Sequence, residues 1–200
     1  MKVFALVGGV LMLALTSWSQ DHTAAIRHHQ DSLNTKFANP ETSPLTEEAV
    51  KTFEALEFYH IDQAYRVEAR FEPYENPETV FFATTTDRQP EYKVYAKLTF
   101  TLAGQEHTLN IYQNVRLSQM PQYRDYLFLP FNDLTNGEGS YGGGRYLDLR
   151  MPKGNTIVLD FNKCYNPYCA YNHKYSCPIP PDGQYVPVAI EAGVKAPEKH

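Results

Sequence analysis

The chain has 200 residues, a formal net charge of −5 at pH 7 and 42% hydrophobic residues. This length is sufficient for one hydrophobic core of ordinary size, and no internal repeat or low-complexity segment divides the sequence, so we expect a single domain. The acidic balance and the lack of a basic block argue against nucleic acid or an anionic membrane as the main partner.

The first 19 residues have the pattern of a secretory signal peptide. Lys2 precedes an apolar run over residues 3–15, and small residues stand at Ser17 and Ser19, the two positions that a signal peptidase reads. The alternative, an N-terminal core helix, fits less well with the two glycines in the run and with the abrupt change to the polar string QDHT.

Removal of residues 1–19 would leave a mature protein that begins at Gln20 and is exported to the periplasm or secreted. The apolar run is too short to span a bilayer, which needs about 20 residues, so we expect no transmembrane segment after cleavage. Loss of Lys2 would change the formal charge from −5 to −6. In this interpretation, residues 20–200 form one β-rich domain.

Two helices are expected at the start of the mature chain. The first covers residues 21–37, where apolar residues recur at helical spacing and Asp21 can cap the start. Its apolar residues are Ile26, Leu33 and Phe37, and its solvent-facing residues are His28, His29, Asp31 and Lys36. The second helix is expected to begin after the N-cap residue Thr46. Its apolar face is short, so it has to pack against another element.

Alternating apolar and polar residues then predict a series of strands. Residues 65–71 alternate between apolar and charged side chains. Residues 92–102 place every second, apolar side chain on one face and turn into a strand with Leu109 and Ile111, which predicts a long hairpin. Residues 126–131 are apolar on both faces and predict an interior strand.

A second hairpin is predicted over residues 145–162, with a three-residue loop at residues 152–154 that contains proline and glycine. This loop fixes the register of the two strands. On the predicted core side, Leu149 lies opposite Ile157 and Leu147 lies opposite Leu159.

The other side of this predicted hairpin is polar. Tyr146 lies opposite Asp160, Asp148 follows on the same face, and Asn162 is one step beyond. Such a face of an antiparallel sheet commonly meets water. The alternative is a polar pocket, formed if the flanking irregular segments fold over the face.

One flanking segment is the string FNDLTNGEGSYGGGRYLDL at residues 131–149, which contains five glycines. Its backbone amides could converge on an anion, although it matches neither a P-loop nor a dinucleotide fingerprint, and a tightly turned surface loop is the alternative. Arg145 follows the glycines directly and is suited to a carboxylate or phosphate.

Several strings resemble the bacterial domain of unknown function 1684 family. These are SPL at residues 43–45, the glycine-rich string above, LDFNKCYNPYCAYN at residues 159–172, CPIPP at residues 177–181 and AGVK at residues 192–195. They occur in the family order over nearly the whole mature chain. The resemblance implies little about activity, because the family is uncharacterised. Its pattern has cysteines at Cys169 and Cys177 and usually none at Cys164.

The cysteines of an exported protein are expected to form disulfides. We predict a bond between Cys169 and Cys177, with Cys164 free and buried. The alternative is a zinc site in which Cys164, Cys169, His173 and Cys177 are the four ligands. Its spacing is only loosely that of known zinc modules, and export disfavours reduced thiols, so we expect no metal.

The predicted fold is mainly β, an antiparallel β-sandwich or barrel with two N-terminal α-helices. The favoured function is a non-catalytic binding or envelope-associated module that recognises a small polar ligand without a cofactor. The alternative is a periplasmic hydrolase that uses Asp148, Asp160 and Arg145, so whether the protein is an enzyme stays open. The candidate ligand-binding residues are Arg145, Tyr146, Asp148, Asp160, Asn162, Tyr165 and Asn166.

Overall fold

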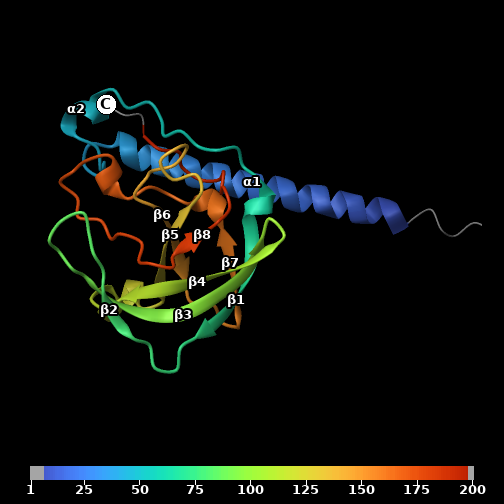
Figure 1. The fold of residues 1–200 in the computed structure, drawn as a ribbon. Coiled ribbons are helices and arrows are strands. Elements are labelled where there is room, and N and C mark those ends of the chain that lie inside the picture. Colours follow the sequence, from blue (N-terminus) through green and yellow to red (C-terminus); the bar gives the residue numbers. More distant parts are fainter. Residues whose placement is uncertain (1–6, 198–200) are drawn as a thin grey trace, which may run out of the picture.

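A computed structural model describes the backbone of residues 7–197 and the side chains of residues 20–197. One long helix lies across one end of a strongly curled sheet and projects beyond it (Figure 1). The first six residues of the expected signal peptide lie outside the described residues, so its cleavage stays a prediction. Within residues 7–197, no helix combines the length and the apolar character needed to cross a membrane.

The N-terminal region contains one main helix instead of the two that the sequence predicts. Helix α1 (Val7–Ala38) runs through Asp21 without ending, and Ile26 and Phe37 are buried as predicted. Helix α2 (Glu47–Lys51) has only five residues, and the Thr46 hydroxyl accepts a hydrogen bond from the Ala49 amide at 3.2 Å, which confirms the N-cap. The helix ends after five residues because its apolar face is too short to stabilise a longer one.

Within the described residues, eight strands form one sheet with the order β6-β5-β4-β3-β1-β7. The β2 strand pairs with β3, and β8 pairs in parallel with β5, whereas all other pairs are antiparallel. The sheet curls into a half-barrel (Figure 1), and a sandwich is not found among these strands. The strands are β1 (Arg66–Pro73), β2 (Thr79–Phe81), β3 (Glu91–Leu102), β4 (Gln105–Asn114), β5 (Tyr126–Asp133), β6 (Arg145–Arg150), β7 (Thr156–Asp160) and β8 (Tyr185–Val186). The 3-10 turns are η1 (Gln63–Tyr65), η2 (Leu117–Gln119), η3 (Pro121–Tyr123), η4 (Phe161–Lys163) and η5 (Tyr168–Ala170).

The predicted hairpin of β3 and β4 is present, with a tight turn at Ala103 and Gly104. The prediction that all alternate apolar residues of β3 share one face is wrong. A bulge between Val94 and Ala96 shifts the register, so that the two side chains face opposite sides of the sheet. The residues after the bulge enter the main core, and those before it join an aromatic cluster on the other face.

The predicted pairing of β6 with β7 is wrong, although their core residues are correct. In the structure Leu147 of β6 pairs with Leu129 of β5, and Leu159 of β7 pairs with Val67 of β1. Both Leu147 and Leu159 are nevertheless buried in the main core. Alternation determines which face of a strand is buried, but it does not select the neighbouring strand.

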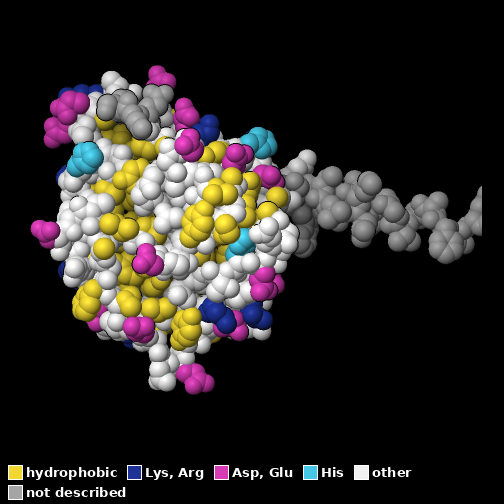
Figure 2. Space-filling model, in the orientation of Figure 1, with side chains coloured by type: hydrophobic (Ala, Val, Ile, Leu, Met, Phe, Trp, Pro, Cys, Tyr) yellow, Lys and Arg dark blue, Asp and Glu magenta, His cyan; other side chains and the backbone are white. Residues whose placement is uncertain are grey.

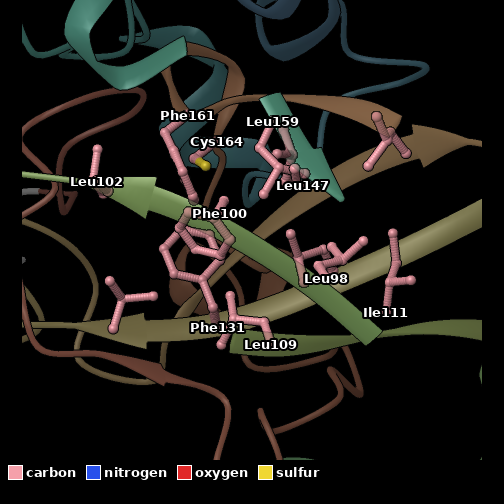
Figure 3. Packing of buried hydrophobic residues seen from close by; sticks show 14 of the residues in the cluster. Leu98, Phe100, Leu102, Leu109, Ile111, Phe131, Leu147, Leu159, Phe161 and Cys164 are labelled. Carbon is pink, nitrogen blue, oxygen red and sulfur yellow. The ribbon is translucent and has the colours of Figure 1, made fainter. Parts of the chain in front are cut away.

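The strands β6 and β7 therefore stand at the two ends of the sheet. Residues 161–166 follow β7 in the chain and cross from the end of β7 to β6. This crossing segment passes through η4 and then forms a backbone bridge in which Tyr165 exchanges two hydrogen bonds with Tyr146 of β6. Helix α1 packs against η4. The crossing segment also supplies Phe161 and Cys164 to the main core, beside Phe100 (Figure 3).

The sheet has apolar side chains on both of its faces. The concave side holds the main core, which Figure 3 shows in part. The other side holds the aromatic cluster of Phe82, Tyr92, Tyr112, Phe128 and Tyr146. On the face seen in Figure 2, apolar side chains reach the surface across the middle, and charged side chains lie mostly around the margin.

Candidate functional site

Asp148 is an exposed carboxylate on β6 that two tyrosines hold in place. The hydroxyls of Tyr126 and Tyr165 both donate to Oδ1 of Asp148, each at 2.7 Å. Burial raises the pKa of both phenols, and the negative charge of Asp148 raises it further, so both remain protonated donors at neutral pH. Within the described residues, Oδ2 of Asp148 receives no protein hydrogen bond, which leaves it open to a ligand.

Asp160 ends β7 and is buried, with an exposed fraction of 6%. Its Oδ1 accepts hydrogen bonds from the backbone amide of Asn162 at 3.2 Å and from the Asn162 side chain at 2.9 Å. Its Oδ2 lies 2.8 Å from Nε2 of His22 in α1. The buried carboxylate of Asp160 therefore has donors in the backbone and side-chain amides of Asn162, and it also contacts the imidazole of His22.

Asn162 joins this carboxylate to Asp62, the residue that caps η1 ahead of β1. Its side-chain nitrogen donates to the carbonyl of Asp62 at 2.8 Å, and its side-chain oxygen accepts from the amide of Asp62 at 3.0 Å. Asn162 is almost fully buried. Its side chain is therefore a bridge within the protein and not a free ligand contact.

His29 of α1 is close enough to both aspartates for their charges to act on it. The pKa of its imidazole is lowered by burial and by the positive charge of Lys163, while the Lys163 backbone, Asp160 and Asp148 act in the opposite direction. The ring is therefore neutral at pH 7. Its Nε2 is buried and has no hydrogen-bond partner among the described residues, and a buried polar atom without a partner calls for a water or a ligand.

These groups lie in one polar region where α1 packs on the crossing segment. We define the polar seam as His22, His29, Asp148, Asp160, Lys163 and Tyr165. The sequence placed Asp148, Asp160 and Tyr165 among the candidates, and the structure brings them to this one region. It does so through the crossing segment and α1, and not through the predicted hairpin.

Arg145 does not belong to the polar seam. Its side chain is fully buried, and it donates to Oδ2 of Asp133 at 2.6 Å and to the carbonyls of Ile190 and Ala192. Arg145 does bind a carboxylate, as expected, but this carboxylate is Asp133 of the protein itself. Its guanidinium is not directed to Asp148 or to Asp160, the carboxylates with which the hydrolase hypothesis groups it.

Two other candidates have internal partners. The Tyr146 hydroxyl donates to the carbonyl of Pro178, and its ring belongs to the aromatic cluster. The Asn166 side chain donates to the carbonyl of Lys195 at 2.7 Å and to the hydroxyl of Tyr171 at 3.1 Å. Both side chains are buried and hold the crossing segment and the C-terminal segment in place.

The sequence interpretation missed His22 and His29, and it assigned His29 to the solvent face of the helix. The spacing of the two histidines in the sequence could have indicated that both are partly buried. His22, Ile26 and His29 are separated by four and three residues, so they share the face of α1 that buries Ile26. His28 does remain exposed, as expected.

The glycine-rich loop does not fold over the polar seam, because its side chains pack elsewhere. A Cβ atom at Gly139 would lie 2.2 Å from the hydroxyl of Tyr59, so a larger residue there would displace the Tyr59 side chain. Next to the loop lies an open hollow of about 660 Å³. Its charged lining residues are Glu57, Glu138, Glu191 and Lys195, of which Lys195 lies 3.6 Å from Glu57.

The structure holds all three cysteines as free thiols. Cys164 is part of the main core, as predicted for a buried thiol. Cys169 and Cys177 are neighbours, and the amide of Cys169 donates to Sγ of Cys177 at 3.1 Å. Within the described residues, His173 and the three cysteines do not assemble into a cluster that could hold a metal.

The comparisons with known proteins agree with the resemblance seen in the sequence. The chain belongs to the family described as "Protein of unknown function (DUF1684)", whose family model matches residues 51–195. The fold is similar to the solution NMR structure of an uncharacterized protein from Haloarcula marismortui, with 33% sequence identity and a TM-score of 0.70. That similarity covers 92% of this chain and 99% of the other. No curated protein matches the chain.

Proposed function

We propose that the protein is an exported binding module that recognises a small polar ligand at the polar seam. The observation that carries this proposal is the geometry of Asp148. Two phenols fix one oxygen of an exposed carboxylate, and the other oxygen points to no protein donor among the described residues. A carboxylate oriented in this way is ready to accept hydrogen bonds without first losing side-chain entropy.

The imidazole of His29, close to Asp148, limits the class of ligand that would fit. A neutral imidazole has one donor and one acceptor nitrogen, and within the described residues Nε2 of His29 has no partner. Asp148 therefore presents an acceptor, and His29 presents a second polar atom that needs a partner. A ligand with several hydroxyl donors, such as a saccharide or another polyol, suits this arrangement best.

Substitution of Asp148 tests the proposal. We expect Asp148→Asn to weaken binding of a monosaccharide by about ten- to hundredfold, the value of one hydrogen bond to a charged group. Isothermal titration calorimetry with a panel of neutral and amino monosaccharides measures this change. Asp125→Asn is the matched control, because Asp125 is an exposed carboxylate that binds Arg150 and lies outside the polar seam. Equal affinities of the wild type and Asp148→Asn would contradict the assignment.

Export is part of the same proposal. The apolar run before Ser17 and Ser19 supports cleavage after residue 19, so N-terminal sequencing of the natural protein should begin at Gln20. Recovery of the intact chain from the cytoplasm would contradict export. His22 would then be the third residue of the mature chain, and its contact with Asp160 would fix the new N-terminus to the domain.

In an exported protein we propose that Cys169 and Cys177 can be joined by a disulfide. Their contact in the thiol form supports this pairing. Mass spectrometry of unreduced peptides tests which cysteines are joined. A bond from Cys164 to either of the others would contradict the proposal.

A further inference from the structure

The neighbouring thiols of Cys169 and Cys177 lie under the glycine-rich loop. Cys169 lies in η5 and has an exposed fraction of 5%, and Cys177 has one of 7%. Thr85 fixes Cys177 from the opposite side, because its hydroxyl accepts from the Cys177 amide at 3.1 Å and its amide donates to the Cys177 carbonyl at 3.0 Å. The pair is thus held between two ordered segments.

Tyr141, in the glycine-rich loop, lies beside the two thiols, and its hydroxyl lowers the pKa of Cys169. The loop is shaped for this contact, because a Cβ atom at Gly143 would lie 2.5 Å from the Tyr141 ring. Only a glycine at this position lets the ring stay where it is. The glycine-rich string and the cysteine-rich string, which stand out separately in the sequence, therefore form one structure.

The environments of the two sulfurs differ. The pKa of Cys169 is lowered to about 6, first by a hydrogen bond from Cys177, with further hydrogen bonds from Thr85 and Tyr141 and with burial opposing them. The same contact raises the pKa of Cys177. Both thiols also act on Tyr146, whose pKa is raised mainly by burial. Cys169 is therefore the thiolate of the pair at neutral pH, and thiolates are the reactive form.

We propose that Cys169 and Cys177 form a thiol–disulfide exchange site in which Cys169 is the attacking sulfur, Cys177 the resolving sulfur and Tyr141 a movable cover. The substrate class is a small molecule or peptide that carries a disulfide. This proposal does not depend on the polar seam, so either can fail without the other.

The exchange balances in two steps. The Cys169 thiolate attacks one sulfur of the substrate disulfide, which breaks the substrate S–S bond, forms a mixed disulfide on Cys169 and releases the first thiolate. Cys177 then loses its proton and attacks Sγ of Cys169, which releases the second substrate thiolate. The protein dithiol is oxidised to a disulfide, and the substrate disulfide is reduced to two thiols.

Oxidised glutathione is the probe for the order of attack. The reduced full chain is incubated with it, quenched with acid and mapped by mass spectrometry. We expect Cys177→Ala to accumulate glutathione on Cys169, and Cys169→Ala to accumulate far less on Cys177. Cys164 should stay unmodified in both, because it lies in the main core. Equal labelling of the two variants would overturn the proposal. So would a wild-type Cys169–Cys177 disulfide that persists in a reduced glutathione buffer, since it would be structural only.

Substitutions of two neighbouring glycines test the role of Tyr141 as a cover. Gly143→Ala should displace Tyr141 and increase the rate at which iodoacetamide alkylates the Cys169 thiolate, by up to about tenfold, the factor that corresponds to one hydrogen bond. The rate is measured well above the pKa of Cys169, because loss of the Tyr141 contact also raises this pKa. Gly142→Ala is the matched control, because its Cβ would meet only Gly137 at an ordinary distance of 3.7 Å. In the wild type, the alkylation rate of Cys169 should rise around pH 6. Equal rates in the two glycine variants would contradict the role of Tyr141, and faster labelling of Cys177 than of Cys169 would overturn the assignment of the attacking sulfur.

Discussion

Arg145→Met should lower the free energy of unfolding by about 3–5 kcal/mol, because it leaves the carboxylate of Asp133 buried without its cation. Both side chains are fully buried, and Arg145 also donates to two carbonyls of the C-terminal segment. The substitution therefore removes one charge and three hydrogen-bond donors at once. Urea denaturation measures the loss.

Arg150→Met is the matched control for this experiment. Arg150 lies on the same strand and contacts Asp125 at the same distance of 2.6 Å, but its side chain is 55% exposed. An exposed ion pair contributes at most about 1 kcal/mol. If Arg145→Met and Arg150→Met cost the same, the buried pair would not hold the C-terminal segment as described. The double variant Arg145→Met/Asp133→Asn should recover part of the loss, since no unpaired charge remains buried.

Leu159→Ala should cost about 2–5 kcal/mol, because it leaves a cavity in the main core. Leu159 is fully buried, whereas its neighbour Val158 is 38% exposed. Val158→Ala therefore serves as the control and should change stability by less than about 0.5 kcal/mol. Thermal or urea denaturation of the two variants gives the comparison. A similar loss in both would mean that β7 does not present Leu159 to the core.

The sequence predicts which strand face is buried more reliably than which strands are neighbours. Leu147 and Leu159 could be assigned to the core from alternation alone, since a side-chain period of two is a property of each single strand. Their partners could not, because the loop at residues 152–154 is also compatible with strands that diverge. In the structure its two ends bond to other segments, Met151 to Asp125 and Asn155 to Phe71.

The same limit applies to the candidate site. Alternation within β6 and β7 places Asp148 and Asp160 on the polar faces of their strands, but the residues around them come from elements far away in the sequence. His22 is 138 residues from Asp160, and only the packing of α1 on the crossing segment brings them together. For Arg145 the sequence predicts the kind of partner but not its identity. Its position after the glycines indicates an anionic partner, and the structure shows that this partner is Asp133 of the same chain.

The bulge in β3 could not be predicted from the pattern of apolar residues. Tyr92 and Ala96 have the same parity, yet they lie on opposite faces because Tyr95 is an extra residue in the strand. The apolar character continues on both sides of the bulge, since each face of the sheet carries its own cluster. Because the alternation of apolar residues in β3 continues unbroken from Tyr92 to Leu102, it gives no sign of where the strand changes faces.

The ring NMR signals of His29 and His28 test the polar seam most directly. The two residues are adjacent in α1, but His28 is exposed whereas Nε2 of His29 is buried without a partner. On titration with a monosaccharide that binds, the account predicts a saturable shift of the His29 signals, no comparable shift of His28, and loss of the His29 shift in Asp148→Asn. A bound saccharide that leaves His29 unchanged, or a His29 shift that persists fully in Asp148→Asn, would contradict it.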